Sequence, residues 1–493
     1  MNDKNLIIRN EADSSLKEWR EKEKTALELL QVVGELRFDR AIELVLFRND
    51  IYDSRPSEVL NQHLIATNYI DQPIPIELSL GIANVISSIK DLAPSKIDIG
   101  KLAIEIMEMS SDVGEIEVES FIRKKLNDFI GAASNTNDPK DVVLYGFGRI
   151  GRLAARRLIS MTGKGEQLRL KAIVLRPKLK DKYEETQKRA ALLQHDTVHG
   201  EFRGTIDIAE DGSEIIVNGN RIQMIYARSP EEIDYSIYGI ENAIVIDNTG
   251  VWRDRAGLSL HLRPGASHVM LTAPGKDVEN IVYGVNQHVL ENSNDNVISA
   301  ASCTTNAIVP LIKLMKDNFG IAKGHIETIH AYTNDQNLID NFHKKQRRGR
   351  GAATNMVLTT TGAAKAVSKV IPELHGKLTG NAIRVPTPNV SIAIMNLTVE
   401  KPTSVEEINN LVKNASLRGD LVEQLSYSTS TEFVSSNAVG STATSVFDAP
   451  STIVSQDGLN VTLYAWYDNE FGYTCQVIRL AKYVAKVRRY AYY

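Results

Sequence analysis

The residue best suited to covalent chemistry is Cys303, one of 2 cysteines in the chain. Hydroxyl side chains surround it in the run SCTT at 302–305, and apolar residues follow at helical spacing over 308–315. We therefore expect the thiol at the start of a helix, where free N–H groups and the helix dipole favour a thiolate and lower the thiol pKa. This pattern predicts a nucleophile at Cys303. The other cysteine, Cys475, is predicted to be a buried structural residue.

A nucleophilic thiol needs a base, and His330 is the candidate. It ends an apolar run and is followed at once by Thr333, Asn334 and Asp335. A lone histidine on an apolar face is commonly a core residue, but these polar groups are suited to orienting an imidazole or holding a polar ligand. The pattern favours a thiol–imidazole pair.

Residues farther along are typical of anion binding. Three arginines lie within 347–350, and Thr361, Gly362 and Arg384 follow on later segments. Guanidinium groups bind phosphate in a planar fork, while hydroxyl and backbone N–H groups add further donors. We expect two oxyanion sites near the thiol, and a solvated basic loop is the alternative for 344–350.

A glycine pattern indicates a nucleotide site. The strand-like run 142–145 leads into GFGRIG at 146–151, an amphipathic helix follows over 149–161, and a second apolar strand follows at 171–175. In a Rossmann unit the first glycine makes the tight turn, the second lets the backbone approach a pyrophosphate, and the third lets the helix pack on the strand. The pyrophosphate then lies at the helix N-terminus.

The residue after this second strand bears on the choice of cofactor. An acid normally stands there and accepts hydrogen bonds from the adenosine ribose 2′-OH, but this chain has Arg176, followed by Lys178, Lys180 and Lys182. An arginine binds a 2′-phosphate in a planar fork, whereas an acid repels it. We predict that NADP is used at least as well as NAD. The alternative is that Arg176 points into solvent and NAD binds without the acid.

The segment before these motifs is built differently. Residues 1–138 hold 5 of the 31 glycines and a net charge of −9, whereas the rest has a net charge of +5. Apolar spacing predicts helices after a capping box at Ser15 and Glu18, near 42–46, and over 76–89, 99–109 and 116–130. We therefore predict a small all-α domain, joined to the rest by a linker at 131–139.

Composition excludes several classes of protein. The chain has 493 residues, of which 43% are hydrophobic and 24% charged, so global disorder is excluded. No run is apolar and long enough for a membrane helix, and no signal peptide is apparent, so we expect no membrane partner and a cytoplasmic location. Two cysteines exclude a disulfide framework and a cysteine-rich zinc site, and no metal site is predicted. The net charge of −4 argues against nucleic-acid binding.

Together, the motifs resemble phosphorylating glyceraldehyde-3-phosphate dehydrogenase, in its long bacterial form with an extra front segment. The segments GFGRIGRL, SCTTN, HAYTNDQ, RRGRGAA, TTTGAAKAVSKVIPELHGKLTG, RVPTPNVS and WYDNEFGY occur in the family's order over about 141–490. The implied fold is α/β. It has a Rossmann domain at 139–302, completed by a C-terminal helix at 474–490, and an α+β catalytic domain at 303–473 with a mostly antiparallel sheet.

The resemblance implies a reversible oxidation of glyceraldehyde 3-phosphate with inorganic phosphate to 1,3-bisphosphoglycerate. Cys303 would attack the aldehyde and form a thioester, and His330 would accept the thiol proton and steady the oxyanion. Asn469 would hold the nicotinamide carboxamide, with Tyr473 nearby. The other implied cofactor contacts are Gly146, Phe147, Gly148, Arg149, Ile150, Arg228 and Thr249. The implied phosphate contacts are Ser302, Thr304, Thr333, Asp335, Thr361, Gly362 and Arg384, with Arg348 or its neighbour Arg347.

The resemblance also implies a homotetramer, in which the 341–354 loop lines a neighbouring subunit's cofactor site. Residues 1–138 would then affect assembly, regulation or the choice of a protein partner. One departure from the family is Ala307, which stands where a second cysteine is common and so precludes an active-site disulfide. Two alternatives stay open: an erythrose-4-phosphate dehydrogenase, and a regulatory binding protein on the same scaffold. The intact HAYT and TTTGAAK segments favour glyceraldehyde 3-phosphate, and the presence of Cys303, His330 and Arg384 favours catalysis.

Overall fold

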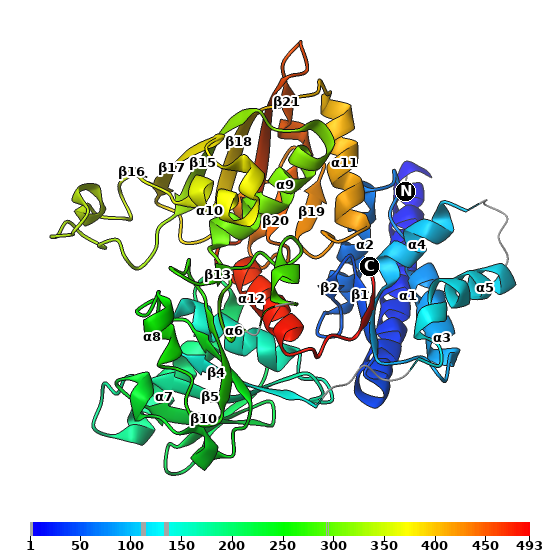
Figure 1. Ribbon diagram of the computed structural model, residues 1–493. Helices are drawn as coiled ribbons and strands as arrows, with labels where there is room; N and C mark the ends of the chain where they lie inside the picture. Colours follow the sequence, from blue (N-terminus) through cyan, green and yellow to red (C-terminus); the bar gives the residue numbers. More distant parts are fainter. Residues whose placement is uncertain (1–2, 110–114, 133–137, 292, 294) are drawn as a thin grey trace. The chain divides into compact units, whose positions relative to one another are not determined.

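The computed structural model describes residues 3–109, 115–132, 138–291, 293 and 295–493 (Figure 1). The chain forms two compact units. The larger unit is Asn137–Val487, and the front unit combines Met1–Thr136 with Arg488–Tyr493. Part of the predicted linker, 133–137, lies outside the described residues. Among the residues that are described, no helix is both long and apolar enough to cross a membrane.

A nine-stranded sheet in the order β13-β14-β12-β11-β4-β5-β10-β9-β8 carries the first half of the larger unit. Its strands from β13 to β10 run parallel, and β9 and β8 are added antiparallel. The central strands are apolar and buried on both faces, as expected for parallel strands covered by helices. The strands are β4 (Lys140–Tyr145), β5 (Leu168–Leu175), β8 (Ile206–Ile208), β9 (Glu214–Val217), β10 (Asn220–Tyr226), β11 (Ala243–Asp247), β12 (Ala266–Leu271), β13 (Glu279–Asn280) and β14 (Val297–Ser299).

Helices cover this sheet. One of them follows the glycine turn and packs against the C-terminal helix. The helices are α6 (Arg149–Ser160), α7 (Lys182–Gln194), α8 (Arg255–Ser259) and α12 (Phe471–Val484), and a small hairpin is made by β6 (His195–Asp196) and β7 (Gly200–Glu201). Helix α12 packs against α6 and shares its apolar core. The C-terminal helix is thus present, but it spans Phe471–Val484 rather than the predicted 474–490.

The second half of the larger unit is a mixed sheet in the order β16-β17-β15-β18-β22-β20-β19, with β21 beside β22. The β15–β17 and β19–β20 pairs are parallel and the other pairs are antiparallel, so the predicted antiparallel character holds except at these two. Helices α9 and α10 pack against it. The elements are β15 (Lys323–Ala331), β16 (Val357–Thr359), β17 (Leu378–Val385), β18 (Ser391–Thr398), β19 (Leu425–Ser428), β20 (Ser445–Asp448), β21 (Ile453–Val454), β22 (Asn460–Tyr467), α9 (Cys303–Phe319), α10 (Ala363–Val370) and α11 (Val405–Leu417).

The front unit is not all-α, which corrects the sequence prediction. It contains a sheet in the order β2-β1-β3-β23. The predicted helix near 42–46 is instead β1, whose four residues are all buried. A short buried apolar run has no periodicity that separates strand from helix. The strand form is satisfied by pairing with the adjacent β2 and with the more distant β3. The elements are β1 (Glu43–Leu46), β2 (Asn49–Asp50), β3 (Ser95–Asp98), β23 (Tyr490–Tyr492), α1 (Asp3–Arg40), α2 (Pro56–His63), α3 (Ile76–Ser88), α4 (Ile99–Met107) and α5 (Glu115–Lys125).

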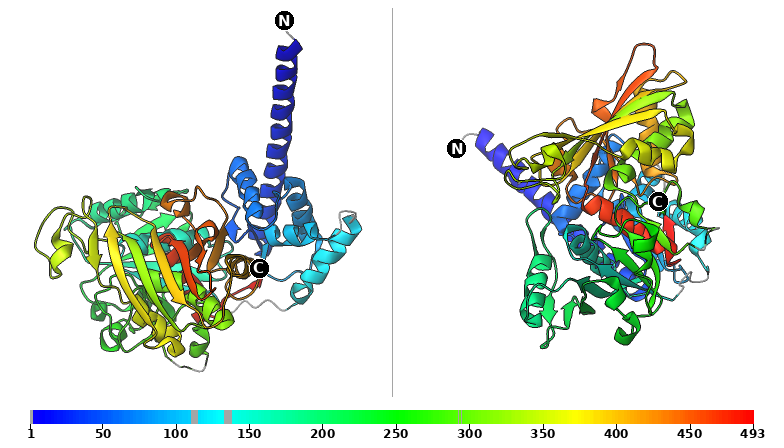
Figure 2. Two further views of the ribbon diagram at one scale, coloured as in Figure 1. Left: turned by 90° about the horizontal axis from the view of Figure 1, so that it is seen from above. Right: turned by 60° about the vertical axis from the view of Figure 1, so that its left-hand side comes forward.

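Helix α1 begins at Asp3, so Ser15 lies within it and the predicted capping box is wrong. Good helix formers on both sides of Ser15 let the helix continue through it. Residues 11–20 are all exposed, and Figure 2 shows this part of α1 extending away from the rest of its unit. The apolar side chains Leu16 and Trp19 are exposed on this arm.

Candidate active site

The three glycines of the nucleotide motif have distinct local roles. Gly146 has a φ of +92°, and a Cβ there would lie 2.8 Å from Thr249 Cγ2. A Cβ on Gly151 would collide with the carbonyl oxygen of Gly146, whereas a Cβ on Gly148 would meet no atom within 4 Å. Gly146 therefore makes the turn and Gly151 allows close packing. Gly148 precedes α6 with open space beside it, which fits a pyrophosphate at the helix start.

The Arg149 side chain is engaged in ion pairs within the chain. Its guanidinium binds Asp196 at 2.8 Å and Glu470 at 2.5 Å, which ties the start of α6 to the start of α12. The side chain of Phe147 is buried in the core, and that of Ile150 packs against the same core. At these three predicted cofactor positions, the backbone is therefore the part available to a ligand.

Two arginines lie at neighbouring strand ends. Arg176 follows β5 and Arg228 follows β10, and these strands pair in parallel so that Tyr226 lies opposite Leu175. Both arginines are exposed. Among the residues that the structure describes, Arg176 makes no hydrogen bond or ion pair, while the backbone N–H of Arg228 donates to Glu232 at 2.9 Å.

Thr249 lies on the other side of the glycine turn, after β11. Its backbone N–H and hydroxyl donate to Asp247 Oδ1 at 2.7 and 2.6 Å. Strand β4 is flanked by β5 and β11, so the strand order reverses beside the glycine turn. This reversal point, outside the carboxyl ends of the strands, is where open α/β sheets bind ligands.

Cys303 is the first residue of α9, as predicted. The Ser302 side chain caps this helix by accepting from Thr305 N at 3.1 Å. Asn306 donates to the carbonyl oxygens of Ala300 and Ser302 at 2.8 and 3.0 Å, which holds the loop before the helix. The thiol Sγ lies 3.6 Å from His330 Nε2, so the fold brings the two residues together across 27 positions of sequence.

Strand register places Arg384 beside His330. The two residues are direct partners in the parallel β15–β17 pair. Arg384 Nη1 donates to Ala331 O at 2.9 Å and lies 2.8 Å from His330 Nδ1. His330 Nδ1 is 2.7 Å from the same carbonyl, and the tautomer that donates to it leaves Nε2 as an acceptor facing the thiol. Arg384 Nε is buried without a hydrogen-bond partner among the described residues, which suits an anionic ligand.

The electrostatics of the pair differ from the sequence expectation. Burial raises the pKa of the Cys303 thiol, although Arg384 and hydrogen bonds at Thr304 favour the thiolate. Burial, together with the charge of Arg384, lowers the pKa of His330 to about 4. The pKa of the Cys303 thiol is thus shifted upward, opposite to the lowering expected from the sequence, because burial outweighs the charge of Arg384 and the hydrogen bonds at Thr304. At neutral pH a thiol faces a neutral imidazole that can accept its proton.

A second arginine completes the cationic side of the site. Arg348 is buried, whereas Arg347 is exposed, so the structure favours Arg348. Its guanidinium binds the Asp335 carboxylate and donates to Thr359 Oγ1 at 3.0 Å. Burial raises the pKa of Asp335, but the Thr333 hydroxyl and the charges of Arg348 and Arg384 outweigh it and hold the pKa low. Thr333 donates to Asp335 at 2.5 Å and so fixes the carboxylate. The fixed carboxylate in turn positions Arg348 through their ion pair.

Some of the remaining predicted phosphate contacts are accessible to a ligand, and others are already hydrogen-bonded within the protein. Thr361 Oγ1 accepts from Ala363 N at 3.2 Å at the start of α10, which packs against α9. Gly362 is exposed, and a Cβ there would meet nothing within 4 Å. The Thr304 hydroxyl, in contrast, is buried and lies 3.0 Å from the Tyr467 hydroxyl, so only its backbone N–H at the helix start suits an anion.

Asn469 is held by a residue that sequence reasoning missed. Ser391 Oγ accepts from Ala331 N at 3.1 Å and donates to Asn469 Oδ1 at 2.8 Å. The carboxamide oxygen is thus fixed, and the NH₂ group is the part suited to binding a ligand. Tyr473 donates to Ala301 O at 2.8 Å and so supports the loop before Cys303. Ser391 and Tyr467 both lie inside the RVPTPNVS and WYDNEFGY motifs, which were the available signal.

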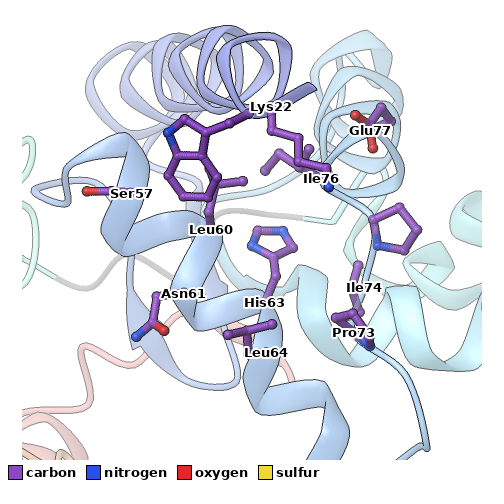
Figure 3. Close-up of a pocket in the computed structure, with 12 residues that line it drawn as sticks. Lys22, Ser57, Leu60, Asn61, His63, Leu64, Pro73, Ile74, Ile76 and Glu77 are labelled. Atoms are coloured by element: carbon purple, nitrogen blue, oxygen red, sulfur yellow. The ribbon is translucent and has the colours of Figure 1, made fainter. Parts of the chain in front are cut away.

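The front unit contains a hollow of a different character (Figure 3). Its volume is about 420 Å³, and its lining is mainly apolar, with Leu60, Leu64 and Ile74 among the residues. His63 is buried there, 2.9 Å from Ser79 Oγ and 2.7 Å from Val59 O, and burial lowers its pKa. Within the described residues, no group of three or more His, Cys, Asp or Glu is arranged to hold a metal ion.

The sequence was compared with protein-family models and with curated proteins, and the larger unit matches one family throughout most of its length. The family model "Glyceraldehyde 3-phosphate dehydrogenase, NAD binding domain" matches 140–255, and the C-terminal domain model of the same name matches 302–469. The glyceraldehyde-3-phosphate dehydrogenase of Priestia megaterium is 42% identical over 343 residues, 69% of this chain and 97% of the relative. Glyceraldehyde-3-phosphate dehydrogenase 1 of Bacillus subtilis is 40% identical over 346 residues, 70% of this chain and 98% of the relative.

One relative extends across nearly the whole chain. A glyceraldehyde-3-phosphate dehydrogenase-like protein of Pseudomonas aeruginosa is 46% identical over 464 residues, 93% of this chain and 98% of the relative. Residues before 140 lie outside both family models. The front segment is therefore shared with this relative, beyond the length that the shorter relatives match.

Proposed function

The chain belongs to the glyceraldehyde 3-phosphate dehydrogenase family, and on that premise we propose how its residues oxidise glyceraldehyde 3-phosphate with inorganic phosphate and NAD(P). The observation that carries the assignment of the catalytic residues is the 3.6 Å distance between Cys303 Sγ and His330 Nε2 at the start of α9. This arrangement places a nucleophile in contact with a base and beside two arginines. It is suited to transferring an acyl group from the thiol to an anionic acceptor.

Cys303 and His330 act as a pair. As Sγ attacks the aldehyde carbon, the thiol proton passes to Nε2, and the new oxyanion faces the imidazolium and the Arg384 charge. When bound, the nicotinamide ring accepts the hydride that converts the thiohemiacetal into a thioester. A phosphate oxygen then attacks the thioester carbonyl, and Sγ leaves and recovers the proton from His330. The products are 1,3-bisphosphoglycerate, the reduced cofactor, a proton and the free enzyme.

Two anion sites serve the substrate phosphate and inorganic phosphate. Arg384, whose buried Nε lacks a partner within the described part of the chain, supports the first site, with Thr333 and with Arg348 held by Asp335. The second site is built from the starts of two packed helices. Their donors are Ser302, the backbone of Thr304, Thr361 and Gly362.

The cofactor binds along the carboxyl ends of β4, β5, β10 and β11. Gly148 and the start of α6 would hold the pyrophosphate, and the NH₂ group of Asn469 would hold the nicotinamide carboxamide. We expect NADP to bind at least as well as NAD, because Arg176 and Arg228 are exposed after the paired strands β5 and β10, where their charge would favour a ribose 2′-phosphate, and no acid stands at 176.

The enzyme assembles as a homo-oligomer, a tetramer by the family's pattern. Support comes from the segment around the 341–354 loop, which exposes large apolar side chains at Leu338, Ile339, Phe342 and Met356. Phe342 is 91% exposed. Several large apolar side chains exposed along one segment are typical of an interface with another chain.

The test is a steady-state assay of the full chain. Reduction of NAD or NADP should require both glyceraldehyde 3-phosphate and inorganic phosphate, and Cys303→Ala should remove it, while Cys475→Ala, a buried cysteine on α12, retains it. Phosphate-independent turnover, or full activity in Cys303→Ala, would contradict the proposal. Neither erythrose 4-phosphate nor a purely regulatory role is favoured, because both matching models and the compared relatives carry the glyceraldehyde-3-phosphate dehydrogenase name.

A further inference from the structure

The edge of the front unit's sheet is supplied by the other end of the chain. Strand β23 pairs in parallel with β3, with Tyr490 opposite Ser95 and Tyr492 opposite Ile97. The preceding residues up to Val487 belong to the larger unit. The chain therefore enters the front unit a second time, through a segment of six residues from Arg488 to Tyr493.

Buried charged side chains of the front unit are directed at this segment. Glu43, Lys101 and Glu105 are 5%, 8% and 9% exposed. Glu43 accepts from Arg489 Nη1 at 3.0 Å, and Glu105 accepts from the Tyr492 hydroxyl at 2.5 Å. A buried charge is costly unless it is paired and hydrogen-bonded. The segment supplies a partner for each carboxylate, and Glu105 is also paired with Lys125 at 2.9 Å.

Lys101 recognises the segment in two ways. Its Nζ donates to the carbonyl oxygen of Tyr493 and lies 4.6 Å from the centroid of the Tyr492 ring. A second ring contact stacks Phe129 on Tyr490, with the ring centroids 5.3 Å apart. The two tyrosines are partly buried, and Ala491 between them is exposed.

This arrangement has the features of peptide recognition by strand addition. Main-chain pairing at a sheet edge provides affinity, and sites for alternate side chains provide specificity. We propose that the front unit is a strand-binding module for an extended basic–aromatic peptide, Arg-Tyr-Ala-Tyr, and that residues 488–493 of this chain occupy it in cis. Strand β23 follows α12 by only a few residues of sequence.

The first experiment measures hydrogen exchange in the intact chain. Tyr492→Phe removes only the hydroxyl that Glu105 accepts, and Ala491→Ser changes the exposed position of the same strand. A hydrogen bond to a charged group stabilises enough to change an equilibrium by roughly ten- to hundredfold. We expect amides of β3 and α4 to exchange faster by about this factor in Tyr492→Phe and to be unchanged in Ala491→Ser. Equal exchange in all three proteins would overturn the proposal.

The second experiment supplies the strand in trans. In a chain ending at Val487, β3 should lose protection, and a synthetic peptide with the sequence of residues 488–493 should restore it saturably. The same peptide with Tyr492→Phe should bind roughly tenfold or more weakly. Protection in the intact chain should not depend on protein concentration if docking is in cis. A shortened chain that the peptide does not protect, or that keeps full protection without it, would overturn the proposal, whatever its dehydrogenase activity.

Discussion

Replacement of Arg176 by aspartate should reverse the cofactor preference. Arg176 follows β5, and its side chain makes no hydrogen bond or ion pair among the described residues, so the substitution breaks no side-chain contact of that kind. An aspartate at this point can accept from a ribose 2′-OH, as in NAD-binding Rossmann units, and it repels a 2′-phosphate. Arg176→Asp should therefore weaken the binding of NADP and strengthen the binding of NAD.

The size of the effect follows from the exposure of the side chain. A hydrogen bond to a charged group contributes about 1.5–3 kcal/mol, but Arg176 is exposed and solvent screens it, so we take the lower end, roughly a tenfold loss for NADP. A ribose hydrogen bond gained by NAD adds a further factor of a few. We expect the ratio of kcat/KM for NADP to that for NAD to fall by roughly thirty- to hundredfold.

The assay is initial rates with both cofactors at fixed glyceraldehyde 3-phosphate and phosphate. Arg221→Asp is the matched control, because it makes the same charge change at the opposite end of β10 and should leave the ratio unaltered. Higher ionic strength should reduce the NADP preference of the wild type, since exposed charges are screened. A wild type that strongly prefers NAD, or an unchanged ratio in Arg176→Asp, would refute the reasoning.

The remaining predictions concern the thiol, its neighbours and the front unit. His330→Asn should lower kcat by roughly 10²–10⁴-fold, since a positioned base contributes that much. Iodoacetate should inactivate the enzyme by labelling Cys303, and loss of activity with Cys303 unlabelled would contradict the assignment. Arg384→Gln should move the midpoint of iodoacetamide alkylation to higher pH, because the positive charge that lowers the thiol pKa is removed, and a midpoint that stays or falls would count against it. Ser391→Ala should weaken cofactor binding roughly 2- to 10-fold by releasing Asn469, measured as KM for NAD(P), with an unchanged KM as the contrary result. A chain starting near Asp138 should remain folded and bind nucleotide, and an insoluble product would show that the larger unit needs the front unit.

Local chemistry in this protein could be predicted from the sequence. The turn at Gly146 and the helix starts at Arg149 and Cys303 depend on neighbours within a few positions, so spacing alone indicated them. The resemblance of whole segments then predicted the family, which the comparisons confirm. Most roles assigned to site residues, and the preference for NADP, stay predictions.

The tertiary structure decided what depends on distant segments. Arg348 is buried while Arg347 is exposed, because Asp335 and Thr359 bind the Arg348 guanidinium from other parts of the fold. Burial by remote segments also sets the upward direction of the Cys303 pKa. Strand β1 pairs with the adjacent β2 and with β3, about fifty positions away. Strand β23, hundreds of positions away, then pairs with the other edge of β3. Hydrophobic spacing records which face of a segment is buried, but backbone pairing and the pairing of buried charges are settled only when remote segments meet.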